Sequence, residues 1–318
     1  MIADVTLLLS RSDLEQVLDI KVCLEVLRHG FESAAAGIAP QRARTDLPGP
    51  GTATVLLPGL AEGMPAYSVK VNAKFPQSQP ALRGVVCLHD ASTGELLAVM
   101  DSATVTSWRT GLSAAVGTHM LARQPAPAIA VIGAGAQWDL VMRGLAALRS
   151  WEHLTVCDLD MEAAQLFGRR HRTAAVVCAA NPREAAREAD IVILATWSRT
   201  PLLDTCDVRP GAHITSLGAD EPGKAELSSA LLKAGRVFVD DVALALATGA
   251  LGTAALSAAD TAGTLSQILQ GTVPGRHTDA HLTIYTPVGL PWQDLTLAWT
   301  AYSYARSTGI GHEYDFVA

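Results

Sequence analysis

The segment from Ile132 to Gln137 has the residue types and spacing of a phosphate-binding turn. It follows the apolar run 128–133 and opens a segment, 136–149, with helical spacing. Its first glycine, Gly133, allows a tight turn, and its second, Gly135, lets the backbone approach a pyrophosphate. The N-terminus of the following helix offers free N–H groups and the positive end of the helix dipole. The pattern predicts a dinucleotide-binding site.

An acidic residue supports this prediction. Asp158 ends the next predicted strand, 154–158, at the distance from the glycines where a carboxylate accepts hydrogen bonds from the adenosine ribose. A carboxylate there repels a 2′-phosphate, so we expect NAD(H), with NADP(H) not excluded. Trp138 stands where such turns usually carry a third small residue. Its side chain is therefore expected to point away from the strand, unless the helix lies further out.

Three cations from separate segments could bind a small carboxylate. Lys70 lies mid-strand in 66–75, where alternation places it on one face with Ser68, Asn72 and Lys74; the alternative is a solvated outer face. Arg109 lies on a helix predicted to run to about Ala122, or else forms a surface salt bridge. Arg42 lies in the polar loop 40–51, or is simply solvated. Because arginine binds carboxylates bidentately, the three predict a carboxylate clamp.

One acid is placed to handle a proton. Asp220 follows the predicted strand 212–217, and ligands of open α/β sheets bind at the carboxyl ends of the strands. We expect Asp220 near the nicotinamide, where it can give or take a proton. The alternative is that it caps a helix over 224–234.

The composition limits the possible functions. The chain has 318 residues, a formal net charge of −7 and 49% hydrophobic residues, which excludes disorder and argues against nucleic acid as a partner. Five cysteines without a C-x-x-C, and scattered histidines, indicate neither disulfides nor a metal site. An acidic N-terminus without a signal pattern, and no apolar run of about 18 residues, favour a cytoplasmic protein that does not enter a membrane.

Two kinds of supersecondary structure are expected to position these residues. The first third predicts a helix over 13–37 and strands at 52–57, 66–75, 84–90 and 95–100, typical of an antiparallel sheet. From 128 onward strands and helices alternate, and a final helix over 291–307 is expected to return to the first domain. The predicted fold class is α/β: a Rossmann-type doubly wound parallel sheet plus an α+β substrate-binding and dimerisation domain. The predicted domains are 1–120 with 290–318, and 121–289.

The chain resembles the ornithine cyclodeaminase/μ-crystallin family, which includes archaeal-type alanine dehydrogenase and ketimine reductases. The resemblance covers essentially the whole length. It is carried by Val69-Lys70, Gly94-Glu95-Leu96-Leu97-Ala98-Val99-Met100-Asp101, Arg109-Thr110, Gly133-Ala134-Gly135-Ala136-Gln137, Ala189-Asp190-Ile191-Val192 with Thr196, Pro210-Gly211-Ala212-His213, Leu217-Gly218-Ala219-Asp220, Pro222-Gly223-Lys224-Ala225-Glu226-Leu227, Val237-Phe238-Val239-Asp240, and Gly289 with Gln293-Asp294-Leu295.

The resemblance implies a homodimer built through the sheet of the first domain, with the active site between the domains. It also implies that Arg42, Lys70 and Arg109 contact the substrate carboxylate, and that Asp220 is the catalytic acid or base. We expect Lys70 to be catalytic as well, because a cation near the substrate carboxylate raises the electrophilicity of the α-carbon and orients it. Ala136, Gln137, Asp158, Thr196, Leu217, Gly218 and Ala219 would line the cofactor, with Thr110 near its phosphates.

Departures from the family pattern bear on the reaction. Val55 stands where cyclodeaminases carry a Glu that helps handle amine or water, and Ala81 and Pro287 replace hydroxyl residues. Asp220 is present, whereas μ-crystallin lacks an acid there. We therefore expect an NAD(H)-dependent oxidoreductase acting on the C–N bond of a small α-amino or α-imino acid. The alternatives are an amino-acid cyclodeaminase that recycles NAD and releases ammonia, and a non-catalytic binding protein of the μ-crystallin kind.

Overall fold

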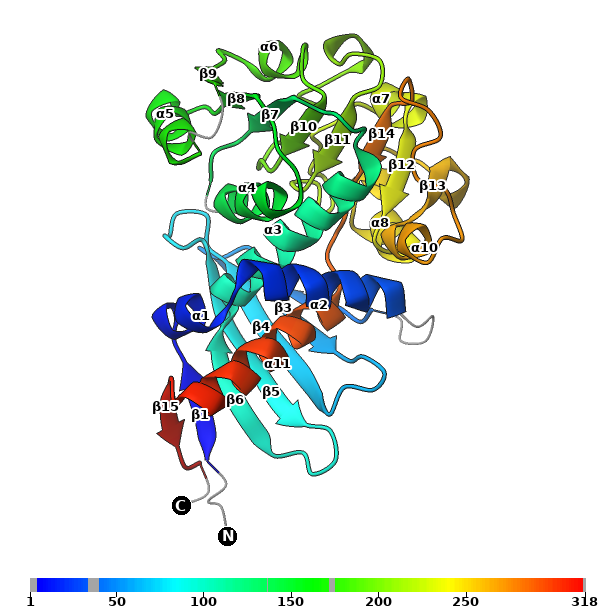
Figure 1. Ribbon diagram of the computed structural model, residues 1–318. Helices are drawn as coiled ribbons and strands as arrows, with labels where there is room; N and C mark the ends of the chain where they lie inside the picture. The colour runs from blue at the N-terminus through cyan, green and yellow to red at the C-terminus, as the bar shows by residue number, and fades with distance from the viewer. Residues whose placement is uncertain (1–4, 34–39, 136, 172–174, 317–318) are drawn as a thin grey trace. The chain divides into compact units, whose positions relative to one another are not determined.

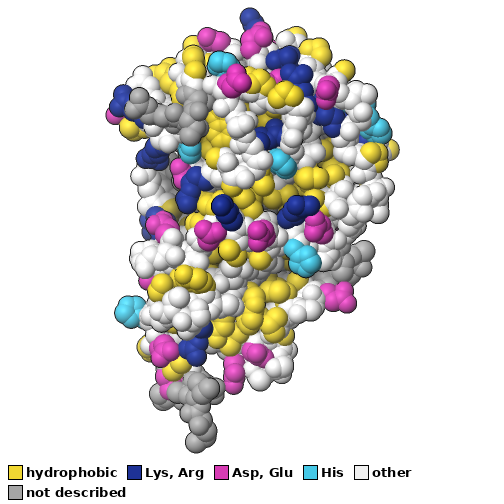
Figure 2. Space-filling model, viewed as in Figure 1, with side chains coloured by type: hydrophobic (Ala, Val, Ile, Leu, Met, Phe, Trp, Pro, Cys, Tyr) yellow, Lys and Arg dark blue, Asp and Glu magenta, His cyan; other side chains and the backbone are white. Residues whose placement is uncertain are grey.

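The chain divides into two compact units. The computed structural model describes residues 5–33, 40–135, 137–171 and 175–316 (Figure 1). Unit 1 comprises Met1–Thr110 and Leu290–Ala318, and unit 2 comprises Gly111–Gly289. The division between the units falls between Thr110 and Gly111, inside the helix α3 (Ser102–Leu121). The boundary predicted from the sequence, after residue 120, lies near the end of the same helix. Figure 2 shows acidic and basic side chains interspersed over one face of the molecule.

Unit 1 is built on a mixed sheet, here called sheet A, with strand order β15-β1-β6-β5-β4-β3-β2. Its neighbours are antiparallel except for β1 and β6, which run parallel. The strands are β1 (Thr6–Leu9), β2 (Ala43–Asp46), β3 (Ala53–Gly59), β4 (Ala66–Lys74), β5 (Leu82–Asp90), β6 (Leu96–Asp101) and β15 (His312–Tyr314). The four predicted strands are present. The predicted polar loop 40–51 is wrong at its centre, because β2 pairs there with β3.

The helices of unit 1 differ from the prediction in one place. A single helix over 13–37 is wrong: α1 (Arg11–Val17) and α2 (Ile20–Ser33) are separate, and residues 34–37 lie outside the described residues. The break arises because the Asp19 side chain accepts from the amides of Lys21 and Val22 and starts a new helix. The last helix, α11 (Pro291–Thr308), packs on β3, β4 and α2 (Figure 1).

The register of sheet A decides where Lys70 points. Leu57, Lys70, Val86 and Met100 lie opposite one another across β3, β4, β5 and β6. All four are buried, and Lys70 is only 1% exposed. Their side chains share one face, because alternate residues of a strand point the same way. Lys70 therefore belongs to the core face of the sheet, and the interpretation as a solvated outer face is wrong.

Unit 2 is built on an all-parallel sheet, sheet B, with strand order β13-β12-β14-β11-β10-β7-β8-β9. The strands are β7 (Ala128–Ile132), β8 (His153–Cys157), β9 (Ala175–Cys178), β10 (Ile191–Leu194), β11 (His213–Ser216), β12 (Arg236–Val239), β13 (Thr261–Thr264) and β14 (Thr283–Tyr285). The direction of winding reverses between β7 and β10, which creates a crevice at their carboxyl ends. This is the predicted doubly wound, Rossmann-type sheet in a mixed α/β protein.

Short helices join the strands of sheet B. They are α4 (Gln137–Leu148), α5 (Met161–Arg170), α6 (Pro182–Ala186), α7 (Ser229–Ala234), α8 (Val242–Ala247), α9 (Ala250–Thr253) and α10 (Leu265–Leu269). Asn181 caps α6, with Pro182 at the first helical position. Asp220 does not cap a helix over 224–234, because α7 begins at Ser229 and Ser228 is its cap. Within the described ranges, no helix has the length and apolar character to cross a membrane.

Candidate active site

The glycine-rich turn joins β7 to α4 at the crevice of sheet B. Gly133 has φ +92°, and a Cβ there would lie 2.8 Å from the Ala195 carbonyl oxygen, so only glycine fits. A Cβ on Gly135 would meet nothing within 4 Å. The turn is therefore tight at its first glycine and open at its second, as a pyrophosphate requires. Ala136 lies outside the described residues, and Gln137 begins α4.

Asp158 is bonded to this turn. One carboxylate oxygen accepts the Ala134 amide at 2.5 Å, and the other accepts the Asp160 amide at 2.8 Å. The end of β8 is thus tied to the phosphate turn through a negative charge. The residues fit NAD(H), because a carboxylate at the end of this strand suits a ribose diol and repels a phosphate.

Trp138 closes the turn from the protein side. Its side chain is 1% exposed, and its Nε1 would lie 3.2 Å from a Cβ placed on Gly133. The indole therefore lies against the end of β7, and the expectation that it points away from the strand is wrong. A large buried ring here replaces the small residue that usually allows close helix–strand packing.

A buried carboxylate for which the sequence predicted no role, Glu226, holds two strand ends together. Glu226 is 1% exposed. Its Oε1 accepts the amide and the hydroxyl of Thr196 at 2.6 and 2.8 Å, after β10. Its Oε2 accepts the Ser216 hydroxyl at 2.7 Å and the Gly218 amide at 2.8 Å, at the end of β11. Burial raises the pKa of Glu226, although all four donors oppose that rise.

We expect Glu226→Gln to destabilise unit 2 by about 1–3 kcal/mol, the usual cost of an unsatisfied buried group. A glutamine has one oxygen acceptor in place of two, so its NH₂ group must face either the Thr196 N–H or the Gly218 N–H. A backbone N–H can only donate, so one of these two donors loses its acceptor. Chemical denaturation with probes in both units measures the loss. The matched control is Glu188→Gln, an exposed acid of the same unit. A variant as stable as the control would contradict this role.

Asp220 lies in the loop after β11 with a cation of its own. Its Oδ1 accepts from the Lys224 ammonium at 2.9 Å. Lys224 is buried and lies 4.5 Å from the centroid of the exposed Trp197 ring. The residues before Asp220, Leu217 to Ala219, are buried at the same strand end. The loop thus presents a carboxylate whose direction is fixed by one lysine.

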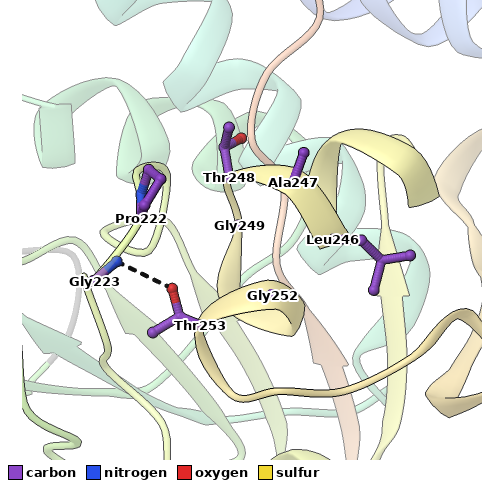
Figure 3. A pocket seen from close by; sticks show the side chains of 8 residues that line it. All are labelled: Pro222, Gly223, Leu246, Ala247, Thr248, Gly249, Gly252 and Thr253. Atoms are coloured by element: carbon purple, nitrogen blue, oxygen red, sulfur yellow. Dashed lines mark hydrogen bonds between the residues drawn. The ribbon is translucent and has the colours of Figure 1, made fainter.

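A small cavity of about 220 Å³ lies next to this loop (Figure 3). Pro222 and Gly223 form one wall, and residues 246–249 with Gly252 and Thr253 form the rest. The Gly223 amide donates to the Thr253 hydroxyl at 3.3 Å across it. None of these lining residues has a charged side chain.

The predicted cations meet in unit 1. The Lys70 ammonium donates to Asp294 Oδ2 at 2.6 Å and to the Thr106 hydroxyl at 3.3 Å. Arg109 Nε lies 3.4 Å from Asp294 Oδ1. Because Arg109 is only 8% exposed, this ion pair is buried, and the alternative of a salt bridge on the helix surface is wrong. Arg42 is partly buried and acts on the charge of Lys70. Thr110 follows Arg109 in α3.

Burial lowers the pKa of Lys70 to about 8. Asp294 opposes this shift by its charge and its hydrogen bond, while Arg109 and Arg42 add to it. The charge of the ammonium therefore begins to fall just above neutral pH. The sequence predicted roles for Lys70, Arg109 and Arg42, but none for Asp294, the carboxylate that lies between two of them.

Residues 4–309 match the ornithine cyclodeaminase/mu-crystallin family. The chain belongs to this family. A relative in the same family is the delta(1)-pyrroline-2-carboxylate reductase of Bacillus cereus, which is 30% identical over 303 residues, 89% of this chain and 91% of the relative.

Solved structures of this type have the same fold. An archaeal alanine dehydrogenase dimer with bound NAD is 27% identical and superposes with a TM-score of 0.91, covering 98% of this chain and 99% of the other. The delta(1)-pyrroline-2-carboxylate reductase of Thermococcus litoralis, in complex with NADH and L-proline, is 27% identical, with a TM-score of 0.90 and coverages of 96% and 99%.

Proposed function

We propose that this protein is an NAD(H)-dependent oxidoreductase that acts on the C–N bond of a small α-amino or α-imino acid. The observation that carries the proposal is the buried cluster of Lys70 and Arg109, with Arg42 close by. Buried cations that converge on one place, beside the carboxylate of Asp294, suit an anionic ligand. The glycine turn and Asp158 support the dinucleotide half of the proposal.

NAD(H) supplies or takes up the hydride when it is bound. Lys70, Arg109 and Arg42 bind the substrate carboxylate and fix the α-carbon, which removes orientational freedom before reaction. Asp220 keeps the substrate nitrogen protonated in the reductive direction and accepts its proton in the other. Lys224 holds Asp220 in place. Thr196 and the residues Leu217 to Ala219 line the cofactor side of the crevice, at strand ends joined by Glu226.

We propose a homodimer formed through the free face of sheet A. Strands β3, β4 and β5 place Leu56, Val71 and Val85 opposite one another on the face away from α11. Leu56 and Val85 are 40% and 39% exposed. Apolar residues in the middle of a sheet face are typical of a protein interface, and the archaeal alanine dehydrogenase is a dimer.

The cyclodeaminase alternative has one specific support, the acid at position 220. Val55 argues against it. Val55 is two residues before Leu57 in β3, and Leu57 lies opposite Lys70 of β4. Val55 therefore shares the face of Lys70, where an apolar side chain offers no base for amine or water. The geometry favours the reductase.

The decisive experiment is a cofactor balance with purified protein. We expect net loss of NADH absorbance, equimolar with product, when 1-pyrroline-2-carboxylate or pyruvate with ammonium is supplied, and slower loss with NADPH. Ammonia release from ornithine or lysine without net change in NADH would establish the cyclodeaminase instead. Tight NADH binding without turnover on any of these substrates would leave only the binding protein.

A further inference from the structure

We propose that Asp294 is a positioning residue of the carboxylate site, which bridges Lys70 and Arg109 through its two oxygens and holds the two cations side by side. This inference rests on the proposed function, which supplies the substrate carboxylate that the two cations bind. The bridge itself is testable without turnover.

The geometry of the bridge is that of one acid shared by two bases. Asp294 Oδ2 lies 2.6 Å from the Lys70 ammonium, and Oδ1 lies 3.4 Å from Arg109 Nε. All three side chains are buried, and Asp294 is 2% exposed. A buried charge is strongly unfavourable without a partner, so each of the three depends on the others.

The start of α11 fixes where this carboxylate points. The helix begins at Pro291, and the Gln293 side chain accepts the Leu290 amide at 3.1 Å, which locks the first turn. Asp294 lies in that turn, where the positive end of the helix dipole favours a carboxylate. The carboxylate thus lies between the N-terminal end of its own helix and its two cationic partners.

The consequence concerns the proton of Lys70. The charged groups that face this ammonium are Asp294 from α11, Arg109 from α3 and Arg42 from the segment before β2. Burial and both guanidinium groups favour the neutral amine, and Asp294 alone among these groups favours the ammonium. Asp294 therefore raises the pKa of Lys70 and extends to higher pH the range in which the ammonium can bind a substrate carboxylate.

The first test is the pH profile of Asp294→Asn. We expect the alkaline limb of kcat/KM to move to lower pH by about one unit or more, the effect of removing a close opposite charge. The loss should be larger at alkaline than at mildly acidic pH and should fall mainly on KM, with the affinity for NADH unchanged. The matched control is Asp46→Asn, which removes the carboxylate of an exposed ion pair with Arg44 in the same unit.

The second test reads the bridge without activity. NMR titration of the Lys70 Cε and Nζ signals should show a lower pKa in Asp294→Asn than in the wild-type protein or the control. An unchanged titration would overturn the proposal even if activity fell. A shifted titration in a protein without turnover would support the bridge and reject only the proposed function.

A folding test covers a variant that does not fold. If Asp294→Asn is unfolded, the double variant Lys70→Met with Asp294→Asn removes an ammonium and its counter-charge together. Refolding of the double variant supports the coupling of the two residues. A double variant in which the two losses of stability simply add up would overturn it.

Discussion

Replacing Asp220 by asparagine is expected to lower kcat by about 10²–10⁴-fold, the usual contribution of a general acid or base. Asparagine keeps the size of the side chain, and its oxygen can still accept from Lys224, so the loop should keep its shape. It cannot exchange a proton with the substrate nitrogen. The affinity for NADH should stay unchanged, because Asp220 is not among the predicted cofactor ligands.

Steady-state rates and a fluorescence titration of NADH binding separate these effects. The matched control is Glu221→Gln, which removes the neighbouring carboxylate of the same loop. Its rate should remain close to that of the wild-type protein. Full turnover in Asp220→Asn would reject the role given to this acid, and equal losses in both variants would indicate a general effect of charge in the loop.

Replacing Lys70 by methionine is expected to lower kcat/KM by about 30- to 5,000-fold, since truncating one partner of a buried charge contact costs about 2–5 kcal/mol. The substrate carboxylate loses a cation on the core face of sheet A. Asp294 then loses the closer of its two described cationic partners, so unit 1 should also lose stability, by about 3 kcal/mol for a broken buried pair. Methionine preserves the length of the side chain, which limits any cavity.

The control for this variant is Lys74→Met, four residues further along β4. Both proteins need a KM measurement and a denaturation curve. We expect the control to change neither quantity strongly. A Lys70→Met protein that binds its substrate as tightly as the control would show that the carboxylate lies elsewhere.

The parts of the fold and site that could be predicted are those that depend on residues close together in the sequence. The glycine turn, Asp158 and the alternation around Lys70 are each defined by neighbours within one strand–turn–helix unit or one strand. The short strands β1 and β15 carry too few residues for a periodic pattern, and their pairing joins the two ends of the described chain. The helix break at Asp19 did have a signal, since aspartate is a common helix cap.

The missed site residues are missed for a different reason. Asp294 meets Lys70 across 224 residues of sequence, and no spacing rule links them. The residues around Glu226 in the sequence give no sign that its side chain is buried. In the fold, its carboxylate accepts four hydrogen bonds from the ends of β10 and β11 and from the loops that follow them. Both acids satisfy partners that only the folded chain brings together.

Because Glu226 bonds the ends of β10 and β11 through the same carboxylate, neither loop can open alone without exposing a charge that the other also uses. The two loops therefore belong to one cooperative unit of local unfolding. A ligand that orders either loop therefore slows the fluctuations of both. The conformational entropy of the two loops is then lost in a single step on binding, and not in a separate step for each loop.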